Sequence, residues 1–285
     1  MPTAAIISKP NKPELAEVLA GVVEWLRRHK YDIVIDDESA GYVSGERQVA
    51  REELAAQKPD FVIVMGGDGT LLAAVRAVAH AGIPLLAVNL GSLGFLTEVS
   101  LSELYEHLRS IADRCCVIDE RAMLHCALWR NGKIAGEYDA LNDVVLRSTA
   151  ARLADFDLSI DSHHVADYKA DALIIATATG STAYSLAAGG PILVPSVSAF
   201  VITPVSPHAL THRPLVVEES SRIVVTVVMG QEEASLAMDG QVSIPLTGGD
   251  RVECRLAKDR VKLVRTSNRY KFFEILRNKL HWGAR

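Results

Sequence analysis

The chain has 285 residues, enough for one large or two medium domains that each bury their own core. Its formal net charge of −5, without any Lys- or Arg-rich run, excludes nucleic acid as an expected partner. No stretch approaches the ~18 to 20 apolar residues of a membrane span, and the apolar run at 4–7 is too short for a signal peptide. We therefore expect a cytoplasmic protein without a membrane partner. Four cysteines without C-x-x-C spacing predict reduced, mostly buried thiols.

The first part of the chain alternates between two patterns. Short apolar runs predict strands, and apolar residues at helical spacing predict the helices between them. The expected strands are 4–8, 31–36, 61–65 and 84–88, and the expected helices are 15–26, 70–80 and 102–111. Strands that are apolar on both faces and alternate with helices predict an α/β domain with a parallel, Rossmann-like sheet. We expect residues 1–119 to form this domain.

Beyond residue 119 the helical periodicity largely disappears. The runs 123–129 and 134–138 flank Asn131 and Gly132, a pair that tolerates the positive φ angles of a hairpin turn. Further strands are expected at 144–147, 156–160, 173–177, 223–228, 235–238, 252–256 and 261–266. Many short strands with few helices predict a C-terminal β-sandwich over 120–266.

The C-terminal tail returns to helical spacing over 268–280, with one apolar side. Its apolar residues are Phe272, Ile275, Leu276 and Leu280. An apolar stripe needs a partner surface, so we expect this helix to pack back on the N-terminal domain. The tail 267–285 is therefore assigned to that domain.

The sharpest local signal is the stretch 66–70, which reads Gly-Gly-Asp-Gly-Thr between a predicted strand and a predicted helix. Helix N-termini offer unpaired N–H groups to anions, and ligands of open α/β sheets bind at the carboxyl ends of strands. Asp68 is a carboxylate placed to take a proton from an attacking hydroxyl. The same residues fit an ordinary tight turn with Asp68 as a helix N-cap, and the loop alone leaves the two interpretations about equal.

A second cluster, 177–185, reads Thr-Ala-Thr-Gly-Ser-Thr-Ala-Tyr-Ser at the end of a predicted strand. Its hydroxyl groups around Gly180 can donate to phosphate or ribose oxygens. Tyr184 offers a flat face to an adenine or nicotinamide ring. The same composition also fits a turn that caps the small-residue helix after it.

Three more stretches accompany these clusters: 89–96 reads NLGSLGFL, 142–145 reads NDVV and 239–241 reads DGQ. Their combination and order strongly resemble the bacterial NAD kinases (ATP-NAD kinases), and the likeness runs from about 61 to 241. The glycine loop alone is shared with diacylglycerol-type lipid kinases and phosphofructokinases. The specificity of the resemblance therefore rests on 181–190 and 89–96.

By this resemblance, Asp68 is the general base that takes the proton from the 2′-hydroxyl of the adenosine ribose of NAD. Gly67 and Gly69 lie against the phosphates. Asn142 and Asp143 match the family's Asn-acid pair, which holds the ribose and adenosine hydroxyls. The family more often has Glu at the second position, and because Asp has a shorter reach, the contact that Asp143 makes is left open.

The resemblance also implies that 1–119 is the phosphate-binding domain and that the β-sandwich is the NAD-binding domain. Its dinucleotide pocket has Tyr184 stacked on a ring, and Asp171 of the same or of a neighbouring subunit approaches the nicotinamide side. The residues expected to line this pocket are Thr182, Ala183, Tyr184, Ser185, Leu186 and Ala187. The other positions expected to touch ligand are Phe95, Arg152, Lys169 and Gln241.

The implied reaction is the ATP-dependent phosphorylation of NAD to NADP. Phosphoryl transfer requires positioning, a divalent cation that neutralises charge on the phosphate oxygens, and a base at the acceptor. Neither loop provides a cluster of metal ligands. We therefore expect Mg²⁺ to be held mainly by the phosphates of ATP, without a dedicated protein site.

A lipid kinase and a non-catalytic NADP(H)-binding sensor are the two alternatives. A lipid kinase shares the glycine loop but requires an exposed membrane-binding surface, and it does not predict Tyr184 with its small polar neighbours. A sensor has no need of Asp68 for its function, whereas a kinase loses turnover in Asp68→Asn. We also expect a homodimer or homotetramer, because the family usually forms these and the β-rich half offers strand edges.

Overall fold

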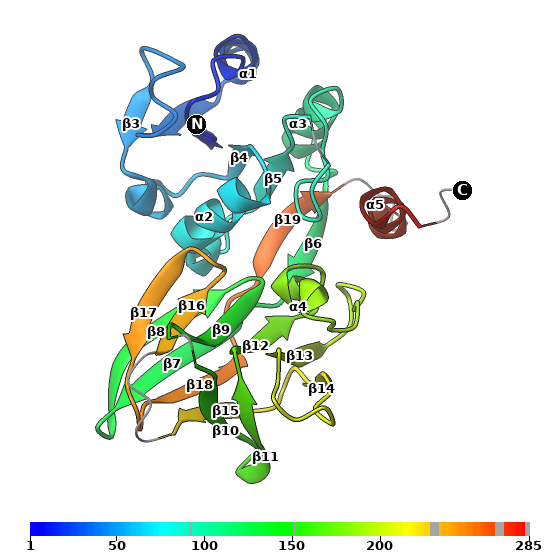
Figure 1. Ribbon diagram of the computed structural model, residues 1–285. Coiled ribbons are helices and arrows are strands. Elements are labelled where there is room, and N and C mark those ends of the chain that lie inside the picture. Colours follow the sequence, from blue (N-terminus) through cyan, green and yellow to red (C-terminus); the bar gives the residue numbers. More distant parts are fainter. Residues whose placement is uncertain (92, 151, 229–233, 266–270, 283–285) are drawn as a thin grey trace. The chain divides into compact units, whose positions relative to one another are not determined.

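The computed structural model describes residues 1–285 apart from 92, 151, 229–233, 266–270 and 283–285 (Figure 1). The chain divides into two compact units: Met1–Glu120 with Arg260–Arg285, and Arg121–Asp259. Within the described residues, no helix is long and apolar enough to cross a membrane. The expected cytoplasmic location stays a prediction.

The first unit is built on a seven-stranded sheet with the order β3-β2-β1-β4-β5-β19-β6. Its strands are β1 Thr3–Ser8, β2 Asp32–Asp36, β3 Arg47–Val49, β4 Phe61–Met65, β5 Leu85–Val88, β6 Val117–Arg121 and β19 Val261–Arg265. The register is parallel where β1 meets β2 and β4, where β2 meets β3, and where β5 meets β4 and β19. Every residue of the central strand β4 is buried, as expected of a strand covered on both faces. The predicted parallel α/β domain is confirmed.

Helices cover both faces of this sheet. They are α1 Leu15–Arg28, α2 Asp68–Val78, α3 Leu104–Ala112 and α5 Lys271–Leu280, with short 3₁₀ turns η1 Arg51–Glu53, η2 Ala55–Gln57 and η3 Ala79–Ala81. The apolar stripes of α1 and α3 share one buried cluster with Ile6 and Ile63. Side chains alternate across a strand, so Ala5 and Val62 point to the other face, where α2 packs against β1 and β4.

The C-terminal helix α5 belongs to the first unit. Ile275 and Leu276 are buried, and the Nζ of Lys271 lies 3.2 Å from a carboxylate oxygen of Glu103, just before α3. The predicted packing of this helix on the N-terminal domain is confirmed. Residues 268–270 of the expected helix lie outside the described part of the chain.

The second unit consists of two six-stranded antiparallel sheets. One has the order β11-β10-β15-β18-β7-β8, with β11 His163–Ala170, β10 Ala154–Ile160, β15 Ile223–Val227, β18 Arg251–Leu256, β7 Leu124–Arg130 and β8 Lys133–Ala140. The other has the order β14-β13-β12-β9-β16-β17, with β14 Leu215–Glu218, β13 Ala199–Val205, β12 Ala172–Thr177, β9 Asp143–Ser148, β16 Ala234–Met238 and β17 Val242–Leu246. The turn η4 Gly180–Thr182 and the short helix α4 Tyr184–Ala187 follow β12.

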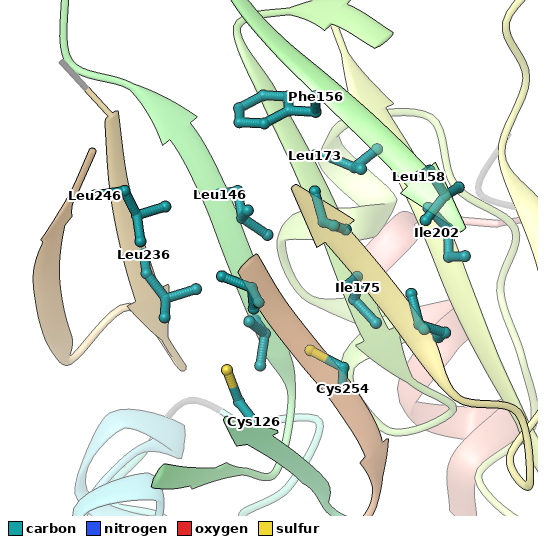
Figure 2. Packing of buried hydrophobic residues seen from close by; sticks show 14 of the residues in the cluster. Cys126, Leu146, Phe156, Leu158, Leu173, Ile175, Ile202, Leu236, Leu246 and Cys254 are labelled. Carbon is teal, nitrogen blue, oxygen red and sulfur yellow. The ribbon is translucent and has the colours of Figure 1, made fainter. Parts of the chain in front are cut away.

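Side chains from both sheets of the second unit form one core (Figure 2). Phe156 and Leu158 come from the first of these sheets, and Leu146, Leu173 and Ile175 come from the second. Alternate residues of each strand point into this core, as expected of two sheets packed face to face. The predicted β-sandwich is confirmed, and so is the hairpin, because Asn131 and Gly132 adopt φ angles of 51° and 74° between β7 and β8.

The strand expected at 261–266 is placed differently from the prediction. We assigned it to the β-sandwich, but β19 lies in the parallel sheet, where Leu263 pairs with Leu85 of β5. A short strand pattern such as Val-Lys-Leu-Val-Arg does not specify which strand it pairs with, so the prediction followed the order of the strands along the chain. The first unit therefore takes up the chain again at Arg260, earlier than the expected 267. Thr266 lies outside the described residues.

Six strands were not predicted, namely β3, β6, β11, β13, β14 and β17. The edge strand β11 shows why: five of its eight residues are exposed, and two of the three residues on its apolar face, Ala166, Tyr168 and Ala170, are small, so its alternation is weak in sequence. The prediction of mostly buried thiols holds for two of the four cysteines. Cys126 and Cys254 are buried between the sheets, whereas Cys115 is exposed and Cys116 is half-buried.

Candidate functional site

The glycine loop, residues 66–70, joins β4 to α2 in the first unit. Gly67 is the extended N-cap of α2, and both Gly67 and Gly69 are exposed. Gly66 is buried, and a Cβ there would overlap the side chain of Thr70, so the turn requires glycine at this position. The first N–H groups of a helix have no intrahelical acceptor. An anion can therefore approach this exposed backbone and accept hydrogen bonds from it.

Asp68 is the first residue of α2, and it does not cap the helix, since Gly67 occupies the N-cap position without a side-chain bond. Its carboxylate instead accepts hydrogen bonds from the next loop. The backbone N–H groups of Phe95, Leu96 and Thr97 donate at 3.0, 3.1 and 3.0 Å, and the Thr97 hydroxyl donates at 3.1 Å. Asp68 is half-buried, so these four bonds fix the orientation of a carboxylate that solvent still reaches.

Gly94 makes this arrangement possible. A Cβ at this position would overlap Oδ1 of Asp68 and Oγ1 of Thr97. The backbone of residue 94 thus passes directly over the carboxylate, and only glycine leaves enough space. The stretch 89–96 therefore matters for the geometry of Asp68, which the sequence did not reveal.

Asn89 holds the other end of the same loop. Its side-chain amide donates to the carbonyls of Thr97 at 3.2 Å and Val99 at 3.1 Å, and its oxygen accepts from the N–H of Gly91 at 3.2 Å. Phe95, which the family resemblance predicts to bind ligand, is half-buried here. Ser92, in the same motif, lies outside the described residues.

A cavity of about 340 Å³ opens beside the exposed side of the glycine loop. Its lining residues are Lys9, Pro10, Glu38, Arg51, Gly67, Gly69, Thr70 and Ala73. Arg51 is held in this cavity by the buried Asp36, to which its Nε donates at 2.8 Å, and by Glu38 at 2.7 Å. Burial raises the pKa of Asp36, while hydrogen bonds from Ser39 and Arg51 oppose that shift. Two cationic side chains, Lys9 and Arg51, thus lie beside backbone donors, a combination that suits phosphate.

In the second unit, the carboxylate of Asp239 fixes the turn that precedes β9. It accepts hydrogen bonds from the backbone N–H groups of Leu141 at 3.0 Å, Asn142 at 2.7 Å and Asp143 at 3.2 Å. The Thr177 hydroxyl donates to the Leu141 carbonyl at 2.6 Å. The Asn-acid pair is therefore held by a residue about a hundred positions away in the chain. This contact gives Asp239, the first residue of the DGQ motif, a structural role.

A cavity of about 280 Å³ lies on the outer face of this sheet. Its lining residues are Asn142, Asp143, Val145, Arg147, Ala183, Tyr184, Ala237, Asp239 and Gly240. Tyr184 is 44% exposed, so an aromatic ligand can stack on its ring. Burial and the negative charge of Asp239 raise the pKa of Asp143 to about 7, although the N–H of Tyr184 donates to its carboxylate. At neutral pH this buried carboxyl group can therefore donate as well as accept a hydrogen bond.

The hydroxyl cluster at 177–185 serves the fold more than we expected. Thr177, Ser181 and Ser185 are buried, and their hydroxyls bond within the unit. Ser181, for example, donates to a backbone carbonyl at 2.7 Å and accepts the Leu193 N–H at 2.9 Å. The expectation that these hydroxyls are available to phosphate or ribose is wrong for these three residues, because they hold the turn after β12.

The structure also explains why residue 180 is a glycine. A Cβ at this position would overlap the carbonyl group of Asn142, so the turn after β12 and the turn before β9 are in close backbone contact. The N–H of Thr177 donates to the same carbonyl at 2.9 Å. The two motifs that the sequence separates by 35 positions thus form one structural element, which places Tyr184 beside Asp143 at the cavity.

The remaining predicted residues divide into three groups. Ala183 lines the cavity together with the Asn-acid pair and Tyr184. Four residues lie on the adjoining η4 turn and α4 but are not among the residues that line this cavity: Thr182, Ser185, Leu186 and Ala187. Arg152, Lys169, Asp171 and Gln241 are exposed and also lie outside its lining. Lys169 has its Nζ 4.0 Å from Asp155 and its carbonyl bonded to the N–H of His208 at 2.8 Å.

The sequence did not single out several residues that the structure brings into these sites. They are Lys9, Arg51, Gly94, Thr97, Arg147 and Asp239. Gly94 and Asp239 carried a signal only as members of the NLGSLGFL and DGQ motifs. The others reach their sites through contacts between distant segments, which no local pattern records.

A helix N-terminus for phosphate and an oriented carboxylate beside it are the parts that phosphoryl transfer to an alcohol requires. Together with the α/β unit and the β-sandwich, they define a phosphotransferase. The comparisons with known proteins agree. The ATP-NAD kinase N-terminal domain matches residues 4–115, and the ATP-NAD kinase C-terminal domain matches residues 141–266.

The chain belongs to the NAD kinase family. It is 55% identical over 286 residues to the NAD kinase of Koribacter versatilis, with all of both chains covered. It is 52% identical over 282 residues to that of Acidobacterium capsulatum, with 99% of each chain covered. The predicted family and enzyme class are therefore confirmed.

Solved structures support the same fold. The yeast NADH kinase, determined as a complex with NADH, superposes with a TM-score of 0.91 at 25% identity, covering 100% of this chain and 89% of that one. The NAD kinase of Archaeoglobus fulgidus, in complex with ATP, has a TM-score of 0.75 at 23% identity, covering 96% and 97%. The second likeness shows the fold alone.

Proposed function

We propose that this chain transfers the terminal phosphate of ATP to the 2′-hydroxyl of the adenosine ribose of NAD, which yields NADP. The observation that carries the mechanism is the carboxylate of Asp68, oriented by four donors at the start of α2. A base must be within hydrogen-bond reach of the proton that it takes, so an oriented and accessible carboxylate is suited to this role. Asp68 is therefore the proposed general base.

The phosphate tail of ATP is proposed to bind at the glycine loop. Gly67 and Gly69 are exposed at the N-terminus of α2, where the helix end favours anions, and the adjoining cavity contributes Lys9 and Arg51. Anions are stabilised by both kinds of donor. The ion pairs of Arg51 with Asp36 and Glu38 keep its guanidinium in place before ATP binds.

NAD is proposed to bind the second unit at the cavity beside α4. Asn142 and Asp143 supply amide and carboxyl groups for ribose and adenosine hydroxyls, and Tyr184 supplies a ring face. By resemblance to the family, further contacts come from Phe95, Arg152, Lys169, Asp171, Thr182, Ala183, Leu186, Ala187 and Gln241.

Mg²⁺ is proposed to accompany ATP. It prefers oxygen ligands and usually keeps several waters, so it is held mainly by phosphates. Glu38 and Thr70 line the proposed phosphate cavity and offer oxygen atoms suitable for such a complex. When bound, the ion neutralises negative charge on the phosphate oxygens, while Lys9 and Arg51 do the same from the protein side.

A homodimer or homotetramer is proposed for the assembly. Both sheets of the second unit end in outer strands, among them β11 and β14, whose edges can pair with a second copy. Light scattering after size-exclusion chromatography measures the subunit number directly, and a monomer at micromolar concentration would refute this proposal.

The function is tested by incubating the full chain with NAD, ATP and Mg²⁺ and coupling the NADP formed to an NADP-specific dehydrogenase. We expect NADP formation that requires all three additions. A parallel incubation with diacylglycerol in detergent micelles tests the lipid-kinase alternative. Phosphorylation of the lipid without formation of NADP would favour that alternative, and NADP(H) binding without turnover would favour a sensor.

A further inference from the structure

The two oxygens of the Asp68 carboxylate have unequal surroundings. Oδ1 accepts three hydrogen bonds, from the N–H groups of Leu96 and Thr97 and from the Thr97 hydroxyl, at 3.0 to 3.1 Å. Oδ2 accepts one, from the N–H of Phe95 at 3.0 Å. We call these the inner and the outer oxygen. A carboxylate has about four acceptor sites on its two oxygens, so the inner oxygen is fully used and the outer oxygen keeps one site open.

Thr97 supplies two of the three bonds to the inner oxygen and is fully buried. Its carbonyl also accepts the Asn89 side-chain amide, which fixes its backbone. Gly94 passes over the same oxygen so closely that a Cβ has no space there. A ligand therefore has no access to the inner oxygen from the side of this loop.

We propose that the outer oxygen receives the proton of the acceptor hydroxyl and that Thr97 is the positioning residue that keeps it directed at that hydroxyl. This inference rests on the proposed function and names the part of Asp68 that performs it. If the Thr97 hydroxyl is lost, the inner oxygen has one fewer anchor and the carboxylate can rotate away from the acceptor.

The hydroxyl proton moves to the outer oxygen, and the hydroxyl oxygen forms a bond to the terminal phosphorus of ATP. The bond between that phosphorus and the bridging oxygen breaks, and its electron pair stays on ADP. The carboxyl group then releases the proton to solvent, so that NAD and ATP give NADP, ADP and one proton.

The first test compares Thr97→Val with Thr97→Ser. Val has nearly the shape of Thr without the hydroxyl, whereas Ser keeps the hydroxyl. Misplacing a catalytic group costs up to about a hundredfold in rate, so we expect kcat to fall about tenfold to a hundredfold in Thr97→Val, with KM for NAD and ATP within about twofold. Thr97→Ser should recover kcat to within about threefold of the wild type. Thr97→Ala removes the same hydroxyl without a new methyl group, and the same loss is expected if the Val variant does not fold.

Ser110→Ala is the matched control, because it removes a hydroxyl from α3 in the same unit that bonds only to the His107 carbonyl, at 2.8 Å. Its kcat should equal that of the wild type. A double mutant with Asp68→Asn separates positioning from general loosening of the loop. Groups that act as one unit are strongly non-additive, so Thr97→Val should cause less than a twofold further loss in the Asp68→Asn background. A full tenfold further loss, or a normal kcat in Thr97→Val, would overturn the inference.

A crystal structure of the wild-type chain with NAD tests the same point without any substitution. We expect the ribose 2′-oxygen within about 3.2 Å of the oxygen that the Phe95 N–H contacts. A 2′-oxygen bonded to the oxygen that Thr97 contacts would overturn the inference. The coupled assay distinguishes failure of the proposed function from failure of this inference. If the wild type forms no NADP, the proposed function is refuted. If the wild type is active and Thr97→Val has the same kcat, only the role of Thr97 is refuted.

Discussion

Each unit has at its candidate site a carboxylate that accepts three successive backbone N–H groups, but the two carboxylates have different roles. In the first unit the carboxylate of Asp68 accepts three successive backbone N–H groups, those of 95–97. In the second unit the carboxylate of Asp239 accepts those of 141–143. Asp68 remains half-exposed, whereas Asp239 is 9% exposed and lies beside a second carboxyl group, Asp143.

This difference in exposure distinguishes a carboxylate that takes part in the reaction from one that holds the backbone of a binding site. At Asp68 the backbone donors orient a charged group that solvent and ligand can reach. At Asp239 they use the charge to hold a turn, and that charge helps to raise the pKa of Asp143 to about 7. The following predictions test whether this division of roles is correct.

Apart from substitution of Asp68 itself, the largest effect is expected for Gly94→Ala. The added methyl group has no space beside the Asp68 carboxylate and the Thr97 hydroxyl, so either the loop or the carboxylate must move. We predict a loss of kcat of about a hundredfold or more, because a displaced base loses its reach. Steady-state kinetics measure this, with circular dichroism to check that the variant is folded. A folded Gly94→Ala with normal kcat would contradict the assigned geometry.

Gly180→Ala should mainly affect stability and NAD binding. Its Cβ would overlap the Asn142 carbonyl, and overpacking of this kind costs about 1 to 3 kcal/mol in the free energy of unfolding. The matched control is Gly67→Ala, where nothing lies within 4 Å of the added Cβ and φ is negative. Urea unfolding compares the two variants. Equal stabilities would show that the close contact between the two turns is unimportant.

Asp239→Asn should weaken NAD binding more than it lowers kcat. The amide cannot accept all three N–H groups, since one of its two terminal atoms is a donor, so the turn at 141–143 loses a hydrogen bond worth about 1.5 kcal/mol. We predict a rise of about tenfold in the Kd for NAD, measured by calorimetry. A fall in kcat with unchanged Kd would instead give Asp239 a role in the chemistry and remove the contrast with Asp68.

The smallest effect concerns pH. The pKa of Asp143 is raised to about 7 by burial and by Asp239, so between about pH 4 and pH 7 the folded chain binds more protons than the unfolded chain. Its contribution to stability therefore falls as pH rises through this window. Asp143→Asn should remove this loss of stability. The melting temperature of the variant minus that of the wild type should therefore increase between pH 5 and pH 8.

Asp250→Asn is the control of opposite sign. Burial would raise the pKa of Asp250, but the hydrogen bonds and charge of Arg130 outweigh it and lower the pKa. The stability that Asp250 contributes is present above the usual carboxyl range and is lost as pH falls. The loss of stability in Asp250→Asn, relative to the wild type, should therefore be complete at pH 7 and become smaller as the pH is lowered. Parallel pH profiles for the two variants would contradict the assignment of Asp143.

The sequence predicted the parts of these sites that are local. The glycine loop follows a fully apolar strand and precedes a helix, so its place at the edge of a parallel sheet could be inferred. The Asn-acid pair and Tyr184 were identified through the family's motifs. Both inferences depend on residues close together in the chain.

The parts that it could not predict depend on long-range contacts. Asp239 is about a hundred positions from the turn that it holds, and Thr97 reaches Asp68 from another strand-to-helix connection. The hydroxyls of Thr177 and Ser181 illustrate the reverse error, because their chemistry suits a ligand but the turn uses them. Composition shows which groups are available, while only packing decides which are already bonded.

The central claim is that the Asp68 carboxylate is the base for phosphoryl transfer to NAD, and Asp68→Asn tests it most directly. The variant should bind NAD with a Kd within about threefold of the wild type, while its kcat for NADP formation falls by about 10²- to 10⁴-fold. An Asp68→Asn variant that forms NADP at the wild-type rate would contradict the account.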